Sequence, residues 1–260
     1  MMAKSDLEIY RHRSKTDAYI KRGRSQESRL FRSERHFLNK VIKKGQHVLD
    51  IGCAAGGVYN ILRNKTGNVK YTGLDIDAEC IKAASDKYPD AEFLVGDFLE
   101  SKFQSDSFDV AMSLFVMGMQ PEYKKFISEL VRVSRQYVIF DVRLRYDGMT
   151  VIDKDTSYFY YHASGKRNYY VILNVFELIN YLHIESLHLK SIRMYGYYPK
   201  DRSSAFVPMP KNKMVVATVC LEKYPQGERD FVRCGGSKQH ADRPWCELDI
   251  RLPGFKKEWV

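Results

Sequence analysis

The feature that most constrains this chain is an alternation of short apolar segments with amphipathic ones between residues 47 and 142. The apolar segments HVLDI, VKYTGLDI, AEFLVGD, FDVAMSLFVM and QYVIFDVRL have the length and residue types of strands. The segments between them, GVYNILRNK, AECIKAASDKY and PEYKKFISELVRVS, have apolar residues at helical spacing, and proline begins the last, where it fits a first helical turn. Strands that alternate with helices in this way predict a doubly wound, mostly parallel sheet.

The flanking segments predict further elements. Residues 5–22 and 27–44 have helical periodicity, and VFELINYLH predicts another helix. IESLHLKSIRMYGYY and KMVVATVCLEKY predict two long strands that pair antiparallel and close the sheet. We therefore expect an α/β fold with a seven-stranded, mostly parallel sheet, an antiparallel closing strand, N-terminal helices and an insertion after strand five.

The chain is expected to have three parts. Residues 1–44 predict a helical cap, and residues 45–223 the main domain, with a polar, Tyr-rich insertion at residues 144–170. Residues 224–260 combine glycine, proline and charge with little periodicity, which indicates an irregular extension.

Charge and cysteines limit the surroundings of the protein. The formal net charge is +10, and residues 1–45 hold thirteen Lys and Arg against five Asp and Glu. Such a segment attracts nucleic acid, anionic lipid or a phosphorylated substrate, unless it is only the solvated face of a helix. Five scattered cysteines form no disulfide framework, which favours a reducing, cytoplasmic location. VAMSLFVMGM is about half as long as the roughly 20 apolar residues of a membrane span, so we expect none.

Three acids at three successive strand ends predict a nucleoside site. Asp50 begins DIGCAAGG, a loop of small residues that lets the backbone approach a ligand before a helix N-terminus. Asp75 ends the second strand, where a carboxylate can accept both hydroxyls of a ribose. Asp97 ends the third and can accept from an exocyclic amine. Each feature alone could be a structural turn or a helix cap, but in an open sheet all three meet at one edge.

VLDIGCAAGG, YTGLDID, AEFLVGDF and SDSFDVAMSLFVM resemble, in order and spacing, the motifs of class I S-adenosylmethionine-dependent methyltransferases. The resemblance covers about residues 45–142 and extends to 222 through the closing strands. The family's loop pattern is acid-x-Gly-x-Gly-x-Gly, and here Ala54 replaces the middle glycine. The resemblance implies S-adenosylmethionine as cofactor and S-adenosylhomocysteine as product. It places Asp50, Gly52, Cys53, Ala54 and Gly56 at the methionine part, Asp75 at the ribose, Ile76, Asp97 and Phe98 at the adenine, and Ser113, Leu114 and Phe115 beneath the methyl group.

Two other interpretations of the loop stay open. A nicotinamide-binding Rossmann domain also has a glycine loop and a later acid, but Ala54 and Ala55 break its Gly-x-Gly-x-x-Gly pattern. A non-catalytic domain that binds S-adenosylmethionine is the other. Within the loop, Cys53 is better explained as a small packing residue than as a nucleophile.

The methyl acceptor is narrowed by motifs that are absent. SLFVMGMQP stands where methyltransferases of nucleobase amines carry Asn/Asp-Pro-Pro-Tyr/Phe, and no cysteine lies there to attack a pyrimidine. His162 or Asp141 could act as a general base, although packing or an ion pair would also explain them. Residues proposed to bind the acceptor are Arg29 and Arg32, as anion contacts, and Tyr160 and Tyr161, by stacking.

These observations favour O-methylation of a small acceptor, glycan-related or phosphorylated. The helix ESRLFRSER and the late strand VVATVCLEK resemble those of stand-alone bacterial methyltransferases of sugar or surface-glycan biosynthesis. An RNA or protein acceptor is the alternative, and nucleic acid is not favoured because no RNA-binding module is recognised. The spacing of Cys234, His240 and Cys246 matches no common zinc pattern, so no metal is expected.

Overall fold

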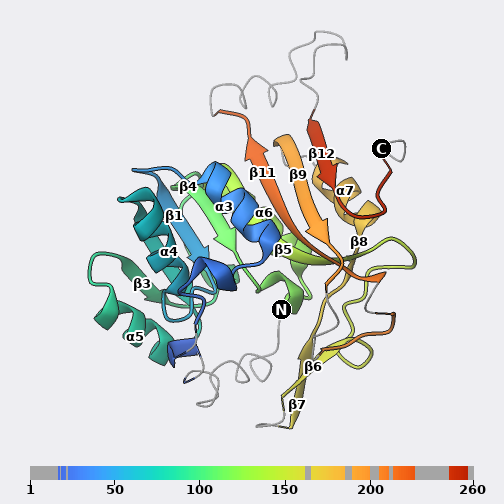
Figure 1. Ribbon diagram of the computed structural model, residues 1–260, viewed down its shortest axis with the longest axis horizontal. Coiled ribbons are helices and arrows are strands. Elements are labelled where there is room, and N and C mark those ends of the chain that lie inside the picture. Colours follow the sequence, from blue (N-terminus) through green and yellow to red (C-terminus); the bar gives the residue numbers. More distant parts are fainter. Residues whose placement is uncertain are drawn as a thin grey trace.

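The computed structural model describes residues 17, 19–21, 23–161, 165–184, 189–199, 205–210, 213–225 and 246–256. In this part of the chain nine strands form one sheet, in the order β12-β9-β11-β5-β4-β1-β2-β3 with β8 beside β5 (Figure 1). Their bounds are β1 (His47–Ile51), β2 (Lys70–Asp75), β3 (Glu92–Val95), β4 (Phe108–Ser113), β5 (Ser134–Arg145), β8 (Leu173–Asn174), β9 (Leu189–Tyr197), β11 (Val215–Lys223) and β12 (Glu247–Arg251).

The strand directions confirm the expected fold. Strand β11 runs antiparallel to its neighbours β5 and β9, whereas the other strand pairs of the described sheet are parallel. The sheet therefore contains the expected seven strands with their antiparallel closing strand, and β8 and β12 in addition.

Helices cover both faces of the sheet, so that one hydrophobic core lies on each face. The helices are α3 (Arg32–Val41), α4 (Gly57–Thr66), α5 (Ala78–Lys87), α6 (Tyr123–Val133) and α7 (Val175–Ile184), with short 3-10 turns η1 (Glu27–Arg29), η2 (Phe98–Glu100) and η3 (Met117–Met119). In β1, Val48 packs with α3 and α4, whereas the next residue, Leu49, packs with α6 and α7. Side chains alternate between the two faces along a strand, so two neighbouring residues pack into different cores.

None of the helices in the described residues has the length and apolar composition that a bilayer span requires.

The strand order creates a switch point at β1. From β1 the chain passes outward through β2 to β3 and then returns to β4 on the other side of β1. At such a point the loops after neighbouring strands diverge and leave a crevice at the carboxyl ends of the strands. The loop rich in small residues lies there, between β1 and α4.

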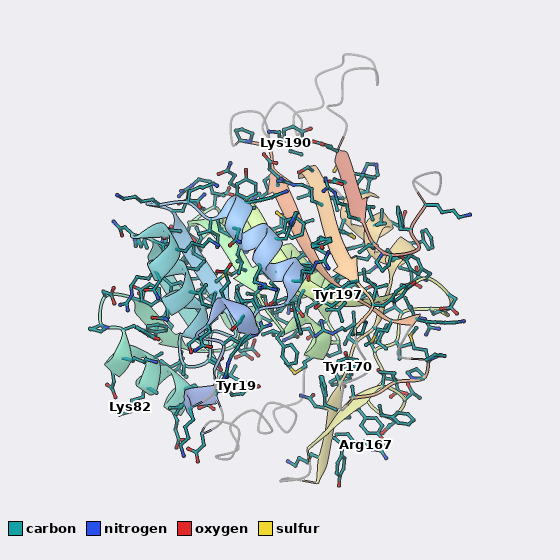
Figure 2. All side chains as sticks on the ribbon, in the orientation of Figure 1. Tyr19, Lys82, Arg167, Tyr170, Lys190 and Tyr197 are labelled. Carbon is teal, nitrogen blue, oxygen red and sulfur yellow. The ribbon has the colours of Figure 1, made fainter. Side chains whose placement is uncertain are left out.

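The Tyr-rich insertion forms a second, smaller sheet that the sequence does not predict. Strands β6 (Tyr158–Tyr161) and β7 (Lys166–Tyr169) pair antiparallel, and β10 (Ala205–Phe206) pairs with β6. The hairpin projects from the body of the molecule, with Arg167 on its outer part (Figures 1 and 2). The guanidinium of Arg167 lies 4.4 Å from the ring centroid of Tyr158.

Helix α3 begins at Arg32, five residues later than the start of the predicted segment. The reason is a cap: the side chain of Glu34 accepts a hydrogen bond from the N–H of Phe31 at 2.6 Å and thereby defines the first turn. Of the helix predicted for residues 5–22, only residue 17 and residues 19–21 are described, and they are helical.

The prediction of an irregular C-terminal extension is wrong for residues 247–251. They form β12, which pairs parallel with β9 at the edge of the sheet. Leu248, Ile250 and Leu252 alternate in the sequence and all pack against the main core. This alternation was the signal for a strand, although a five-residue pattern beside charged residues is weak by itself.

Candidate active site

A cavity of about 350 Å³ lies at the carboxyl ends of β1, β2, β3 and β4. Cavities of this size commonly hold small molecules. Its wall includes most of the residues that the sequence places at the cofactor, namely Asp50, Gly52, Cys53, Ala54, Asp75, Ile76, Asp97, Phe98, Leu114 and Phe115. Residues singled out at separate strand ends therefore converge on one site.

Gly56 and Ser113 lie behind this wall instead of lining it. Gly56 caps α4 with φ +71°, and a Cβ there would lie 2.9 Å from Cζ of Phe93. Ser113 is buried, and its hydroxyl donates to the carbonyl oxygen of Ile51 at 3.3 Å. Both residues pack against other parts of the protein and not against the cavity, so their contact with a cofactor stays a prediction.

The loop after β1 follows a path that few side chains would permit. Gly52 has φ +80°, and a Cβ on it would lie 2.2 Å from Cγ2 of Val116, so glycine is required for both reasons. Ala54, which stands at the family's middle glycine, has φ +46°. Its N–H donates to Oδ2 of Asp75 at 2.8 Å. This hydrogen bond helps to offset the cost of a left-handed alanine, so the replacement preserves the loop.

Asp75 connects the loop with the start of α5. Besides the bond from Ala54, its Oδ1 accepts from the N–H of Asp77 at 2.9 Å. Burial raises the pKa of Asp75, and the backbone donors oppose that shift. Each carboxylate oxygen can accept a second hydrogen bond. The side chain is thereby fixed in the cavity wall and keeps acceptor capacity for two hydroxyl groups.

The next strand end supplies a polar and an aromatic residue. Asp97 caps η2 by accepting from the N–H of Leu99 at 3.0 Å, and it also lines the cavity. The buried ring of Phe98 packs edge-on against Phe126 with centroids 5.2 Å apart. Ile76 lies on the same wall. A carboxylate beside apolar side chains suits a flat ring that carries an amine.

Asp50 is a buried acid beneath the loop. Its Oδ2 accepts from the hydroxyl of Tyr71 at 2.5 Å. Burial raises the pKa of Asp50 to about 7, while the hydrogen bond from Tyr71 acts in the opposite direction. The group therefore titrates near neutral pH in the absence of a ligand.

Cys53 has the properties of a packing residue. It is buried, and a Cβ on the neighbouring Gly73 would lie 2.7 Å from its Sγ. Burial raises the pKa of the Cys53 thiol well above its usual value, which disfavours the nucleophilic thiolate.

The N-terminal segment closes one side of the cavity through residues that the sequence did not assign to the cofactor. Tyr19, Gly23 and Arg24 line it. Nη2 of Arg24 donates to both carboxylate oxygens of Glu34, at 3.0 and 2.8 Å, whereas Nη1 is buried and has no partner among the described residues. A Cβ on Gly57 would lie 2.8 Å from the backbone of Arg24, so the segment rests directly on the loop. The basic composition of residues 1–45 was the available signal for Arg24, and none indicated Tyr19.

The described residues proposed for catalysis or acceptor binding do not line the cavity. Asp141 is buried in β5, where its Oδ2 accepts from Nη1 of Arg143 at 2.6 Å. The guanidinium of Arg32 lies 5.5 Å from the ring centroid of Tyr195. Arg29 is exposed in η1, Tyr160 is exposed on β6, and Tyr161 ends that strand.

His162, Cys234 and His240 lie outside the described residues. The role of His162 in catalysis therefore stays a prediction. The same holds for the roles proposed for the residues that lie away from the cavity.

Comparison with known proteins identifies a methyltransferase domain in this chain. A family model described as a methyltransferase domain matches residues 48–136. The phthiotriol/phenolphthiotriol dimycocerosates methyltransferase of Mycobacterium leprae is 32% identical over 98 residues, which are 37% of this chain and 36% of that protein. The fatty-acid O-methyltransferase of Mycolicibacterium smegmatis is 30% identical over 109 residues, 40% of each chain. These matches span little more than a third of the relatives' length.

The fold extends the likeness beyond the matched sequence. The phosphoethanolamine N-methyltransferase 2 of Haemonchus contortus, solved with S-adenosyl-L-methionine, superposes with a TM-score of 0.59 at 16% identity, over 86% of this chain and 61% of that one. Residues 48–136 are therefore identified as a methyltransferase domain, and the fold of the chain is similar to that of class I S-adenosylmethionine-dependent methyltransferases.

Proposed function

We propose that this enzyme transfers the methyl group of S-adenosylmethionine to an oxygen atom of a small acceptor. The observation that carries the proposal is the cavity itself, which gathers the glycine loop and the acids Asp50, Asp75 and Asp97 at one edge of the sheet. When bound, the cofactor supplies an activated methyl group on a sulfonium. The protein then has to bind the cofactor and the acceptor, orient them and exclude water. Such positioning supplies much of the catalysis of a displacement reaction.

Each part of the cofactor has a matching group in the wall. Asp75 would accept the two ribose hydroxyls, and Asp97 would accept the amine of the adenine, which packs beside Ile76 and Phe98. Nη1 of Arg24, buried and without a partner in the described part of the chain, suits the carboxylate of the methionine. The residues present therefore fit this cofactor in polarity.

The acceptor is proposed to be small and to offer a hydroxyl or an acid oxygen. The relatives that match part of this chain include a phthiotriol/phenolphthiotriol dimycocerosates methyltransferase and a fatty-acid O-methyltransferase. The wall near the end of β4 is apolar, formed by Leu114, Phe115 and Val116. The basic residues Arg29 and Arg32 would attract a phosphate or another anion on such an acceptor. Glycan-related acceptors are therefore part of the proposal.

We place the reaction in the cytoplasm. The cysteines in the described part of the chain are free thiols, which suits a reducing compartment.

The first experiment is calorimetric titration with S-adenosylmethionine, S-adenosylhomocysteine and NAD. We expect both adenosyl compounds to bind and NAD not to bind. A panel of nucleotide sugars, lipid alcohols, fatty acids and short RNA is then incubated with S-adenosylmethionine labelled in its methyl group. Label in a small oxygen acceptor supports the proposal, whereas binding of NAD alone would refute it.

RNA is the second candidate acceptor, because of the positive charge in residues 1–45. Single-stranded RNA that neutralises several phosphates loses affinity steeply with salt, with a log–log slope near −0.7 per phosphate. A small acceptor with one or two phosphates should show a shallow dependence. Steep salt dependence together with methylated RNA as product would favour RNA.

A further inference from the structure

Phe115, which follows β4, has an unfavourable backbone conformation in the wall of the cavity. Its φ is +76°, a region that bulky residues rarely occupy. Its side chain lines the cavity. A strained residue persists only where its surroundings fix it, and such residues are common at functional sites. The groups that fix Phe115 therefore indicate how this wall is controlled.

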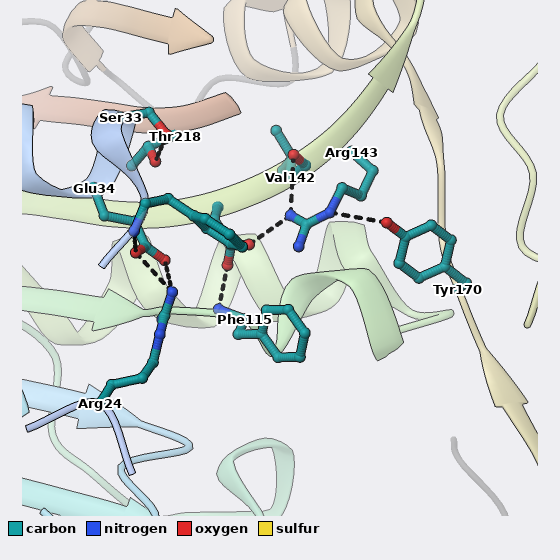
Figure 3. A network of polar contacts seen from close by, with 10 residues as sticks. Arg24, Ser33, Glu34, Phe115, Val142, Arg143, Tyr170 and Thr218 are labelled. Atoms are coloured by element: carbon teal, nitrogen blue, oxygen red, sulfur yellow. Dashed lines mark hydrogen bonds and ion pairs between the residues drawn. The ribbon is translucent and has the colours of Figure 1, made fainter. Parts of the chain in front are cut away.

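A continuous polar chain leads from Phe115 to the insertion (Figure 3). The N–H of Phe115 donates to Oδ1 of Asp141, and Oδ2 of Asp141 accepts from Nη1 of Arg143 at 2.6 Å. Nε of Arg143 donates to the hydroxyl of Tyr170, 3.1 Å away. Asp141, Arg143 and Tyr170 are all buried and lie outside the cavity wall. The chain of contacts runs from the residue Phe115 after β4, through Asp141 and Arg143 of β5, to Tyr170, the residue that follows β7.

Ring contacts follow the same route. The guanidinium carbons of Arg143 and Arg24 lie 5.5 and 5.9 Å from the ring centroid of Phe115. Phe159 of β6 lies 6.3 Å from the ring of Phe115 and 4.5 Å from that of Tyr170. The ring of Phe115 therefore lies among two arginines, the ring of Phe31 at 6.3 Å and the insertion, and its N–H is held by Asp141.

A backbone bond joins the same two regions. The N–H of Val171 donates to the carbonyl oxygen of Gly118 at 2.6 Å, within the turn that follows Phe115. The insertion thus touches the segment of residues 115–118 through a ring and the polar chain, and Val171, the residue that follows the insertion, adds a hydrogen bond.

We propose that Asp141, Arg143 and Tyr170 are positioning residues which hold Phe115 against the cavity, so that the insertion sets the wall at the end of β4. Asp141 acts here through the backbone of Phe115 and not as a base, since both of its oxygens accept hydrogen bonds from the protein. The proposal rests on the proposed function for the identity of the ligand. Its consequence is that changes in the insertion alter cofactor affinity without touching the cofactor.

Calorimetric titration of S-adenosylhomocysteine into single variants tests this coupling. Asp141→Asn removes the charge, and its amide nitrogen cannot accept, so it cannot satisfy both Phe115 and Arg143. We expect about tenfold weaker binding. Tyr170→Phe removes only the hydroxyl, and we expect about threefold weaker binding.

A matched control removes a partly buried ion pair elsewhere. Lys223, at the other end of β11, bonds Asp106 at 2.8 Å and the carbonyl oxygen of Val131 at 2.6 Å. Lys223→Met should lower the melting temperature and leave affinity for S-adenosylhomocysteine within about twofold. A purely structural role for Asp141 predicts the same result for Asp141→Asn.

The double variant Asp141→Asn, Tyr170→Phe tests whether the effects travel along one chain. If they do, the double variant binds about as weakly as Asp141→Asn alone, because the link is already broken. Additive losses, or variants that lose only thermal stability, would overturn the inference. Failure of the unchanged protein to bind S-adenosylhomocysteine would instead refute the proposed function. If Asp141→Asn does not fold, Tyr170→Phe still decides, because a fall in affinity without a fall in melting temperature supports positioning and no change refutes it.

Discussion

The two sides of the cavity are built in different ways. The cofactor side uses backbone geometry between strands adjacent in the sheet, such as the left-handed Gly52 and the bond from Ala54 to Asp75. The opposite side, around Phe115, uses side-chain pairs: Arg24 with Glu34 and, behind the cavity wall, Arg143 with Tyr170. Backbone geometry permits few replacements, whereas side-chain pairs can be exchanged together. We therefore expect single substitutions to weaken cofactor binding more on the first side than on the second.

The largest effect should come from Gly52→Ala. The added Cβ would lie 2.2 Å from Cγ2 of Val116, at a φ of +80° that already disfavours alanine. We expect at least about a hundredfold weaker binding of S-adenosylhomocysteine by calorimetry, as the loop has to move.

Gly45→Ala is the matched control for Gly52→Ala. Gly45 has nearly the same φ, +81°, but a Cβ added to it would have no neighbouring atom within 4 Å. It should cost about 1 kcal/mol of stability and leave affinity unchanged. Equal loss of affinity in both variants would show that backbone strain, and not the clash in the cavity wall, decides.

Asp75→Ala should give the next largest effect. It removes the acceptor of the N–H of Ala54 and the proposed acceptor of two ribose hydroxyls. Leaving those donors unpaired in a closed site costs roughly 2–4 kcal/mol of binding free energy. Asp109→Ala is the control, since Asp109 accepts from the N–H of His47 at the opposite edge of the sheet. Unchanged affinity in folded Asp75→Ala protein would contradict the assignment of the ribose site.

The same comparison explains how much the sequence could predict. Asp50, Asp75 and Asp97 were predicted because each ends a strand, and parallel strand ends meet at one edge of the sheet. The contact of Arg24 with Glu34 and that of Arg143 with Tyr170 depend on how separate segments pack, and no periodicity encodes such a pairing. The same limit concealed β6, β7 and the edge strand β12, which depend on partners elsewhere in the fold.

A smaller effect is expected from pH on the cofactor side. Burial raises the pKa of Asp50 to about 7, so the folded protein binds this proton more tightly than the unfolded chain does. The stability that Asp50 contributes is therefore full below pH 4 and is lost as pH rises toward 7, by about 1 kcal/mol per pH unit. Asp50→Asn keeps an acceptor for Tyr71 and does not titrate. In chemical unfolding without ligand, the stability of Asp50→Asn relative to the unchanged protein should rise between pH 5 and pH 7, and a constant difference would contradict the buried acid.

The smallest effects should come from exposed basic residues on the acceptor side. Neither Arg29 nor Arg32 lines the cavity, so Arg29→Ala and Arg32→Ala should leave affinity for S-adenosylhomocysteine unchanged. With a phosphorylated acceptor, each should raise KM about two- to fivefold at low salt, the range of an exposed ion pair, and the difference should shrink as salt is added. Lys82→Ala is the control, because it removes the same charge from the exposed face of α5, where Lys82 pairs with Asp86. An equal rise in KM for Lys82→Ala would indicate that net charge, and not these two positions, attracts the acceptor. A fall in affinity for S-adenosylhomocysteine in Arg32→Ala would contradict the placement of Arg32 outside the cavity wall.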